Sequence, residues 1–176
     1  MIENKSELYA AIFVIAIIAG AALFYSQNHE KDTIGIFPKK LGDMSLTLYN
    51  EGDVAIEQIK ELHGGTPRKI ENAYVVVYNS NSSNKAKFWV SESTNNDEAV
   101  SLVTAMSNMV GKSGMFSDAM PMNIEGITVY FVSAHMEHMG LYHYFYAKNN
   151  KVYWLQIDNQ DESYRIDIVK KSIKEI

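Results

Sequence analysis

The stretch SAHMEHMGLYHYFY, residues 133–146, has more potential for chemistry than any other part of the chain. It holds three histidines and two methionines, and imidazole with thioether is a ligand set that suits copper. If it forms a hairpin with an odd loop centred on Met139, His135 and His143 face each other across the strands, close enough to share one metal. The metal-binding hypothesis has four candidate ligands: His135, His138, His143 and Met136.

The same stretch has two other interpretations. The simplest is an ordinary hairpin, because a histidine within an aromatic strand is usually packed and hydrogen-bonded. The other is a tip that binds a protein partner, because exposed methionine and aromatic side chains are adaptable contact residues. With a two-residue loop the histidine pair is lost, so we favour partner binding over copper. The partner-binding residues of this hypothesis are Met136, His138, Met139 and Tyr142.

Enzyme motifs are weak in this sequence. Gly111-Lys112-Ser113 ends a predicted helix instead of beginning one, and Met106 stands where a phosphate-binding loop needs its first glycine. The segment 135–138 lacks the spacing of a zinc-protease helix, and no nucleophile elbow is present. Cysteine is absent, which excludes thiol nucleophiles, disulfides and cysteine-held metals. We therefore predict no catalytic residues and no cofactor, with copper as the alternative and an unrecognised enzyme as a weaker one.

The net charge of the chain limits the classes of partner that it can bind. The chain of 176 residues has a net charge of −5 and a pI of about 5.5. A nucleic-acid partner would need a basic face, and no large cluster of lysine or arginine is present. We therefore expect no nucleic-acid binding.

The strongest signal lies near the N-terminus, where residues 8–25 contain no charge. Eighteen helical residues reach about 27 Å, close to the roughly 30 Å of a bilayer core. A cleaved signal peptide is the alternative, but the preceding MIENKSE has one lysine against two glutamates. We therefore predict a single-pass, uncleaved signal anchor that binds the lipid bilayer. Representative anchor residues are Leu8, Phe13, Ile17, Phe24 and Tyr25.

The anchor divides the chain. We expect a short tail at 1–7, the transmembrane anchor at 8–25, a polar linker at 26–37 and a soluble α+β domain at 38–176. The lysines after the anchor mildly favour a cytoplasmic domain. The polar, tyrosine-rich character of the remainder favours the opposite side, which we predict. The expected function is a non-enzymatic, extracytoplasmic interaction domain or accessory subunit, with other membrane proteins as partners.

Hydrophobic periodicity predicts an α+β fold with one antiparallel sheet of five or six strands and helices packed on one face. The other face should be covered by a loop or a partner. The clearest helix spans 95–111, with Ala99, Val103, Met106 and Val110 on one side. The other expected helices are 53–63 and 161–176, and the expected strands are 44–49, 73–79, 85–92, 126–134, 141–148 and 151–158.

An internal alignment bears on the hairpin, and the methionines elsewhere in the chain need a separate explanation. Residues 70–90 and 124–144 align at equal length, which suggests a helix-strand-strand unit used twice and puts residues 133–140 at a hairpin tip. The remaining methionines have an ordinary explanation as gap fillers. We expect Met106 and Met109, on a core helix, to fill gaps in the core. We expect Met115, Met120 and Met122 to lie in a loop rich in Gly and Ser and to fill the core under it.

Overall fold

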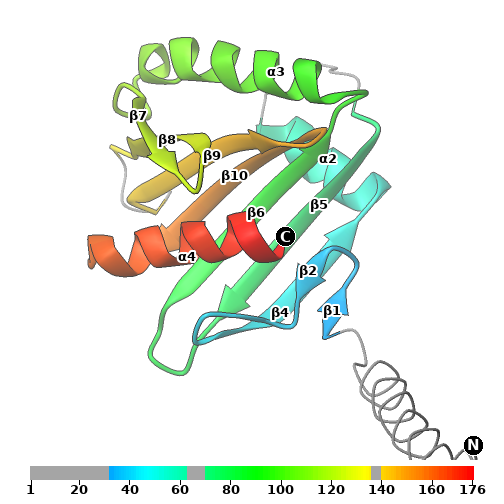
Figure 1. The fold of residues 1–176 in the computed structure, drawn as a ribbon, viewed down its shortest axis with the longest axis vertical. Coiled ribbons are helices and arrows are strands. Elements are labelled where there is room, and N and C mark those ends of the chain that lie inside the picture. The colour runs from blue at the N-terminus through cyan, green and yellow to red at the C-terminus, as the bar shows by residue number, and fades with distance from the viewer. Residues whose placement is uncertain (1–31, 63–69, 136–139) are drawn as a thin grey trace, which may run out of the picture. The chain divides into compact units, whose positions relative to one another are not determined.

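The computed structural model describes residues 32–62, 70–135 and 140–176, and Figure 1 traces them from β1 to α4. Residues from Ile34 to Ile176 form one compact unit. Phe37, which we expected at the end of the linker, is fully buried in its core. The folded part therefore begins ahead of Pro38.

The predicted anchor lies outside the described residues. In the described part of the chain, no helix is both long enough and apolar enough to cross a bilayer. The anchor remains a prediction from the sequence.

The main sheet has eight strands in the order β3-β4-β5-β6-β10-β9-β8-β7, and each strand is antiparallel to its neighbours. Two meanders, β3 to β6 and β7 to β10, meet where β6 pairs with β10. The strands are β3 (Lys40–Leu41), β4 (Met44–Glu51), β5 (Asn72–Asn79), β6 (Lys85–Glu92), β7 (Met120–Ile124), β8 (Ile127–Ser133), β9 (Tyr142–Lys148) and β10 (Lys151–Asp158). A separate two-stranded ribbon consists of β1 (Thr33–Ile34) and β2 (Phe37–Pro38).

The expected α+β class and antiparallel sheet are confirmed, but the strand count was too low. β3 has only two residues, too few to show alternation. β7 contains Pro121, and we took this segment for a loop. Proline is tolerated on an edge strand, and β7 is the last strand of the sheet.

In the described ranges, three α-helices connect or follow the strands: α2 (Asp53–Leu62), α3 (Asn96–Met109) and α4 (Glu162–Glu175). A 3-10 turn, η1 (Val110–Ser113), extends α3. Local caps explain two of the starts. The side chain of Asn95 accepts a hydrogen bond from the backbone of Glu98, and that of Asp161 accepts one from Ser163.

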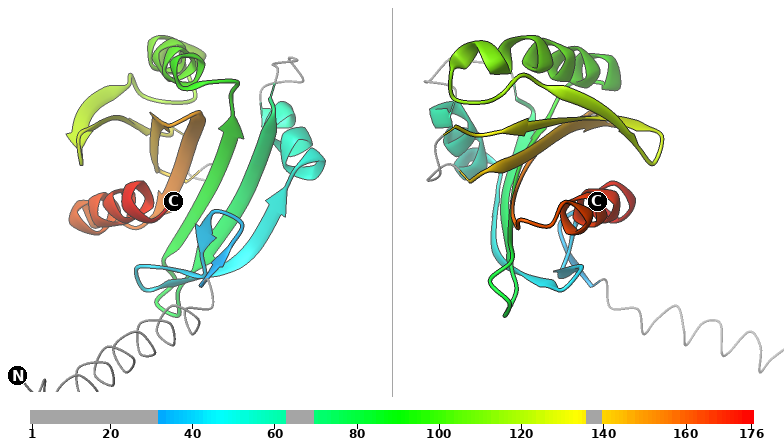
Figure 2. Two further views of the ribbon diagram at one scale, coloured as in Figure 1. Left: turned by 45° about the vertical axis from the view of Figure 1, so that its right-hand side comes forward. Right: turned by 90° about the vertical axis from the view of Figure 1, so that its left-hand side faces the viewer.

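The helices cover both faces of the curved sheet, not one (Figure 2). Successive residues of β10 show this, because Tyr153 and Leu155 pack in the cluster with α4 whereas Val152 packs in the cluster with α3. α2 packs on the same face as α3, through the row in which Val75 is paired with Trp89. The expectation of helices on one face was wrong because strands buried on both sides do not indicate which side a given helix covers.

Register sets the position of the hairpin residues. In the β8–β9 pair, Ser133 lies opposite Tyr142 and Val132 lies opposite His143. The predicted tight turn between β9 and β10 is confirmed, because Lys148 pairs with Lys151. The proposed helix-strand-strand repeat is interrupted: α2 leads directly into β5 and β6, but β7 intervenes between α3 and β8.

Candidate functional site

His143 is buried inside the fold. The indole Nε1–H of Trp154 donates to His143 Nδ1 at 2.9 Å, so the ring proton lies on Nε2. Nε2 lies 3.0 Å from the carbonyl oxygen of Gly140, which can only accept, so Nε2–H donates to it. The imidazole also meets the ring of Phe116 edge-on, at 5.1 Å between centroids. Both nitrogens of His143 therefore have protein partners, and metal ligation would have to break one of these bonds.

His135 lies on the surface and does not pair with His143. Its backbone N–H donates to the carbonyl oxygen of Met115, and its Nδ1 lies 3.0 Å from the carbonyl oxygen of Gly114. The register of β8 and β9 contradicts the facing pair on which the copper hypothesis depended. The other hairpin candidates, Met136, His138 and Met139, lie outside the described residues, and within the described ranges no three potential His, Asp or Glu ligands converge on a metal position.

Tyr142, a predicted contact residue, is half-buried and held by the domain itself. Its hydroxyl donates to the side chain of Gln160 at 2.7 Å. The guanidinium of Arg165 lies 3.7 Å from the centroid of its ring. Tyr142 therefore contributes to packing around α4, and its polar atom is already satisfied.

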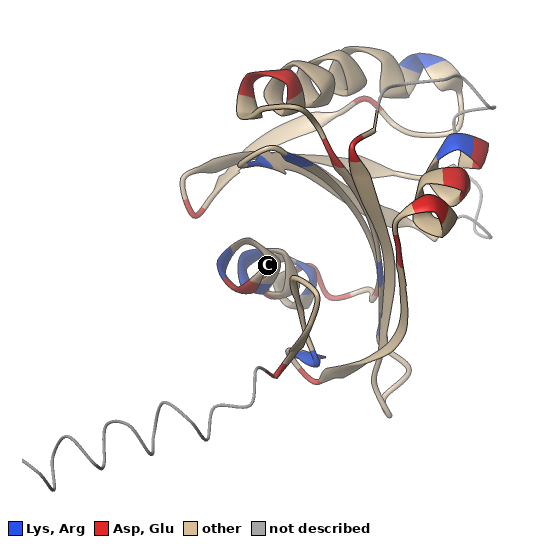
Figure 3. Ribbon diagram, turned by 90° about the vertical axis from the view of Figure 1, so that its right-hand side faces the viewer, with Lys and Arg blue, Asp and Glu red and all other residues tan. Residues whose placement is uncertain are grey.

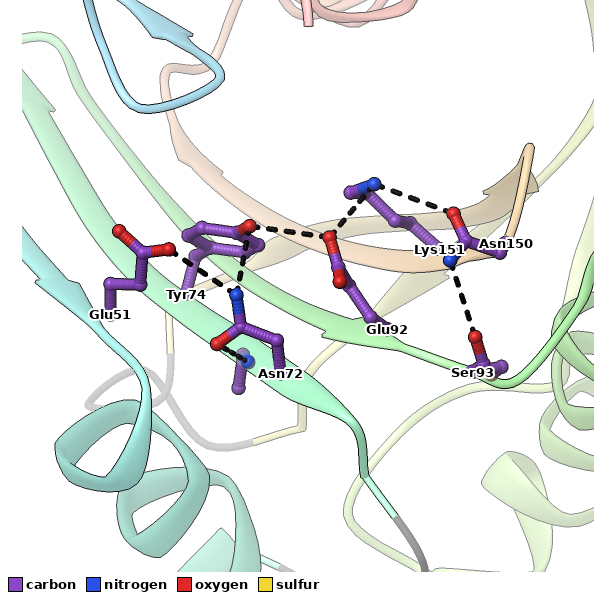
Figure 4. Close-up of polar contacts among 8 residues, drawn as sticks. Glu51, Asn72, Tyr74, Glu92, Ser93, Asn150 and Lys151 are labelled. Atoms are coloured by element: carbon purple, nitrogen blue, oxygen red, sulfur yellow. Dashed lines mark hydrogen bonds and ion pairs between the residues drawn. The ribbon is translucent and has the colours of Figure 1, made fainter.

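A polar network crosses the ends of four strands (Figure 4). The hydroxyl of Tyr74 donates to Glu92 at 3.2 Å, and Lys151 forms an ion pair with the same carboxylate at 2.8 Å. Asn72 donates to the Tyr74 hydroxyl at 3.0 Å and to Glu51 at 3.3 Å. The sequence did not reveal this network, because it depends on the register that aligns Asn72, Glu92 and Lys151.

The contacts of this network have a structural role. Burial, followed by the charges of Glu92 and Glu51, raises the pKa of Tyr74 to about 12. Tyr74 therefore stays protonated at neutral pH and acts as a hydrogen-bond donor, not as a base. The carboxylate of Glu92 is already held by a lysine and a phenol. We interpret the network as a fastening between neighbouring strands.

A second polar hub lies at the opposite ends of these strands, around Asp43. Its carboxylate accepts hydrogen bonds from Tyr164 at 2.6 Å, Asn84 at 3.0 Å and Ser82 at 3.2 Å. The bond from Tyr164 is the main reason that the pKa of Asp43 is lowered. The hub ties the β3–β4 and β5–β6 turns to α4.

One apolar surface feature consists of three exposed methionines. Met109, Met115 and Met120 are 60%, 41% and 53% exposed, and we call these three residues the methionine corner. They lie at the end of α3, after η1 and at the start of β7. Met115 is joined to His135 by the backbone hydrogen bond described above, so the corner adjoins the start of the β8–β9 connection.

The methionine corner is where the sequence analysis missed a candidate site. We placed Met109, Met115 and Met120 in the core, whereas only Met106 and Met122 are half-buried. One signal was available: Met109 lies six residues after Val103, off the buried side of the helix. For residues in loops and short strands no such periodicity exists.

The neighbouring sheet edge is poorly suited to pairing with another strand. The β7–β8 turn has two residues at positive φ, Glu125 and Gly126, which is typical of a type I′ hairpin. Counting back along the ladder from Ile124, the nitrogen of Pro121 faces outward. Because proline has no N–H, a partner strand would lose a donor there. A strand added at this edge would therefore find no backbone donor at Pro121.

Comparisons with protein-family models, with curated proteins and with solved structures found no match to this chain. Any assignment of function therefore depends on the residues and geometry described above.

Proposed function

We propose that the chain is a membrane-anchored, extracytoplasmic interaction domain that serves as an accessory subunit of a membrane complex and has no enzymatic activity. The observation that carries this proposal is the methionine corner. Three large apolar side chains exposed on consecutive segments, from the end of α3 to the start of β7, favour a partner surface, because leaving them in water gains nothing. Methionine is suited to such contacts because its side chain is flexible and polarizable.

The uncharged run at residues 8–25 supports the anchor. The full chain should sediment with membranes and resist extraction by high salt and alkaline carbonate. A chain that starts at Asn28, which keeps the buried Phe37, should remain in the supernatant. A mature N-terminus near Ala22, found by mass spectrometry, would show instead that the run is a cleaved signal peptide.

The side of the membrane needs a separate test. If the domain is extracytoplasmic, protease added to intact cells or spheroplasts should digest it. Protection until the membrane is lysed would place it in the cytoplasm, as the lysines that follow the anchor favour.

The partner surface can be tested by incorporating a photo-reactive amino acid at single positions of the full chain in native membranes. At Met115 or Met120, irradiation should join the chain to a second polypeptide. The matched control is Glu57 on α2, whose side chain is more exposed than either methionine. Equal labelling at all three positions, or no protein adduct at the corner, would contradict the proposal.

The copper hypothesis makes a different prediction for the same preparation. Stoichiometric copper that is lost when His135, His138 and His143 are all replaced by alanine would favour a metal-binding module. A variant with only Met115→Ser should then retain the copper.

A further inference from the structure

The outer face of α3 lacks the charges expected of an exposed helix. The helix packs on the sheet through Ala99 and Val103, while Val100 and Met109 on other sides are 47% and 60% exposed. Between Glu98 and Lys112 the sequence has no charged residue. Figure 3 shows acidic residues at one end of α3, a lysine at the other and none between, whereas α2 has charges along its exposed side. This pattern favours a covered face.

The charges at the two ends of this helix are of opposite sign. Asp97 lies in the first turn of α3, and Lys112 lies in η1, which extends α3 at its C-terminal end. Both are exposed, and in the described part of the chain neither takes part in an ion pair. Such a helix is complementary to an antiparallel copy of itself.

We propose that the outer face of α3 is the contact between two copies of this chain, packed antiparallel about a two-fold axis between Thr104 and Ala105. Asp97 and Lys112 lie equally far from this axis, since 104.5 − 97 and 112 − 104.5 are both 7.5 residues. Each Asp97 is therefore level with Lys112 of the other copy, about 11 Å along the helix from the axis. An isologous contact of this kind forms both ion pairs at once.

The side chains nearest the axis allow this approach. At 100° per residue, Ser101, Thr104, Ala105 and Asn108 fall on the side opposite Ala99 and Val103. All four are exposed, and all are short enough for helix axes to come within about 8–10 Å. Val100 and Met109 flank this centre and would be covered at its margins, so Met109 is shared between this contact and the methionine corner.

The opposite charges at the two ends of α3 favour a second copy as the occupant. The chain carries a net charge of −5, so two copies repel each other across most surfaces. The outer face of α3 avoids this repulsion and adds two opposite-charge pairs. One helix face buries less than the roughly 800 Å² per partner of a standard interface. The dimer therefore depends on the high local concentration that membrane anchoring provides, and to this extent it rests on the proposed function.

The absence of cysteine makes a direct test possible. In the full chain in native membranes, Thr104→Cys should form a disulfide-linked dimer under mild oxidation, because the two Cβ atoms near the axis come within the roughly 3.5–4.5 Å that a disulfide needs. The matched controls, Glu57→Cys on α2 and Lys170→Cys on α4, are exposed but lie off the proposed contact. They should remain monomeric. No dimer from Thr104→Cys, dimers from all three variants, or a disulfide to a different polypeptide would overturn the proposal.

A charge exchange tests the geometry. In the Thr104→Cys background, Asp97→Lys or Lys112→Asp should lower the cross-linked fraction several-fold, and the double variant should restore it. Failure of the double variant to restore the dimer would overturn the antiparallel arrangement. The cross-linking test of the dimer and the photo-adduct test of the proposed function can fail independently. Loss of the dimer with retained photo-adducts at Met115 refutes only the self-association, whereas a dimer without those adducts refutes only the accessory partner.

Discussion

The helices α3 and α4 have the same length, 14 residues, but opposite relations to the sheet. α4 lies within the curve of the sheet and buries five residues, whereas α3 lies on the other face and buries two. The exposed side of α4 carries charges in both its first and last turns, and the exposed side of α3 has none between its ends. α4 therefore stabilises the fold, whereas α3 exposes an uncharged side.

The contacts of α4 explain its share of stability. Lys148 donates to the carbonyl oxygen of Ile173 at 2.5 Å, near the negative end of the helix dipole. The hydroxyls of Tyr146 and Ser172 share a buried hydrogen bond at 3.0 Å. α3 has no comparable set of side-chain bonds to the sheet in the described part of the chain. Substitutions on the two helices should therefore affect different properties.

The largest difference should come from aliphatic truncation. Ile168 of α4 is fully buried, so Ile168→Ala should lower the free energy of unfolding by about 2–5 kcal/mol. Val100→Ala on the exposed side of α3 should change it by less than about 0.5 kcal/mol. Urea denaturation of the domain from Asn28 onward measures both. Similar losses at the two positions would mean that α3 is as important to the core as α4.

A slightly smaller loss is expected at the buried Arg165. Its Nη1 donates to the carbonyl oxygens of Asn159 and Gln160, and its Nε donates to the hydroxyl of Tyr144. Arg165→Met keeps most of the volume but leaves these acceptors unpaired, which should cost about 2–3 kcal/mol. Arg165→Lys should not restore the loss, because an ammonium cannot reproduce the planar fork. Full rescue by lysine in the same urea titration would indicate that charge alone matters.

Tyr146 makes the stability of the same region depend on pH. Tyr146→Phe removes its bond with Ser172 and should cost about 1 kcal/mol at pH 7. Burial raises the pKa of Tyr146 above the ordinary value of about 10. Above pH 10 the unfolded chain therefore loses this proton while the folded chain keeps it, so stability falls as pH rises. The wild type should lose more stability than Tyr146→Phe between pH 9 and 11. Parallel losses would assign the alkaline sensitivity to the other buried tyrosines.

Much of this fold could be predicted from local patterns. The three helices and the longer strands were found where periodicity and caps are strong, as at Asn95 and Asp161. The faces covered by each helix could not be predicted, because β10 is apolar on both sides and the choice depends on the whole sheet. β7 was missed because Pro121 argues against a strand unless the strand is known to lie at an edge.

The candidate site was harder to predict than the fold. The pairing of His135 with His143 depended on a register that the sequence does not specify, and the observed register places Val132 opposite His143. The network of Glu92 and Lys151 likewise joins residues far apart in the chain. Met115 lies in an irregular segment, where no periodicity in the sequence indicates which side chains are exposed.

The smallest effect on stability should occur at the methionine corner, where the effect on binding should be greatest. Met115 is 41% exposed, so Met115→Ser removes little buried surface and should change the free energy of unfolding by less than about 0.5 kcal/mol. The same change removes an apolar contact, so a photo-reactive residue at Met120 should then label the second polypeptide several-fold less. Met122→Ser, at a half-buried position two residues further along β7, should do the reverse, with a clear loss of stability and little change in labelling. If Met115→Ser destabilises the domain as much as Met122→Ser does, Met115 belongs to the core and the corner is not a contact surface.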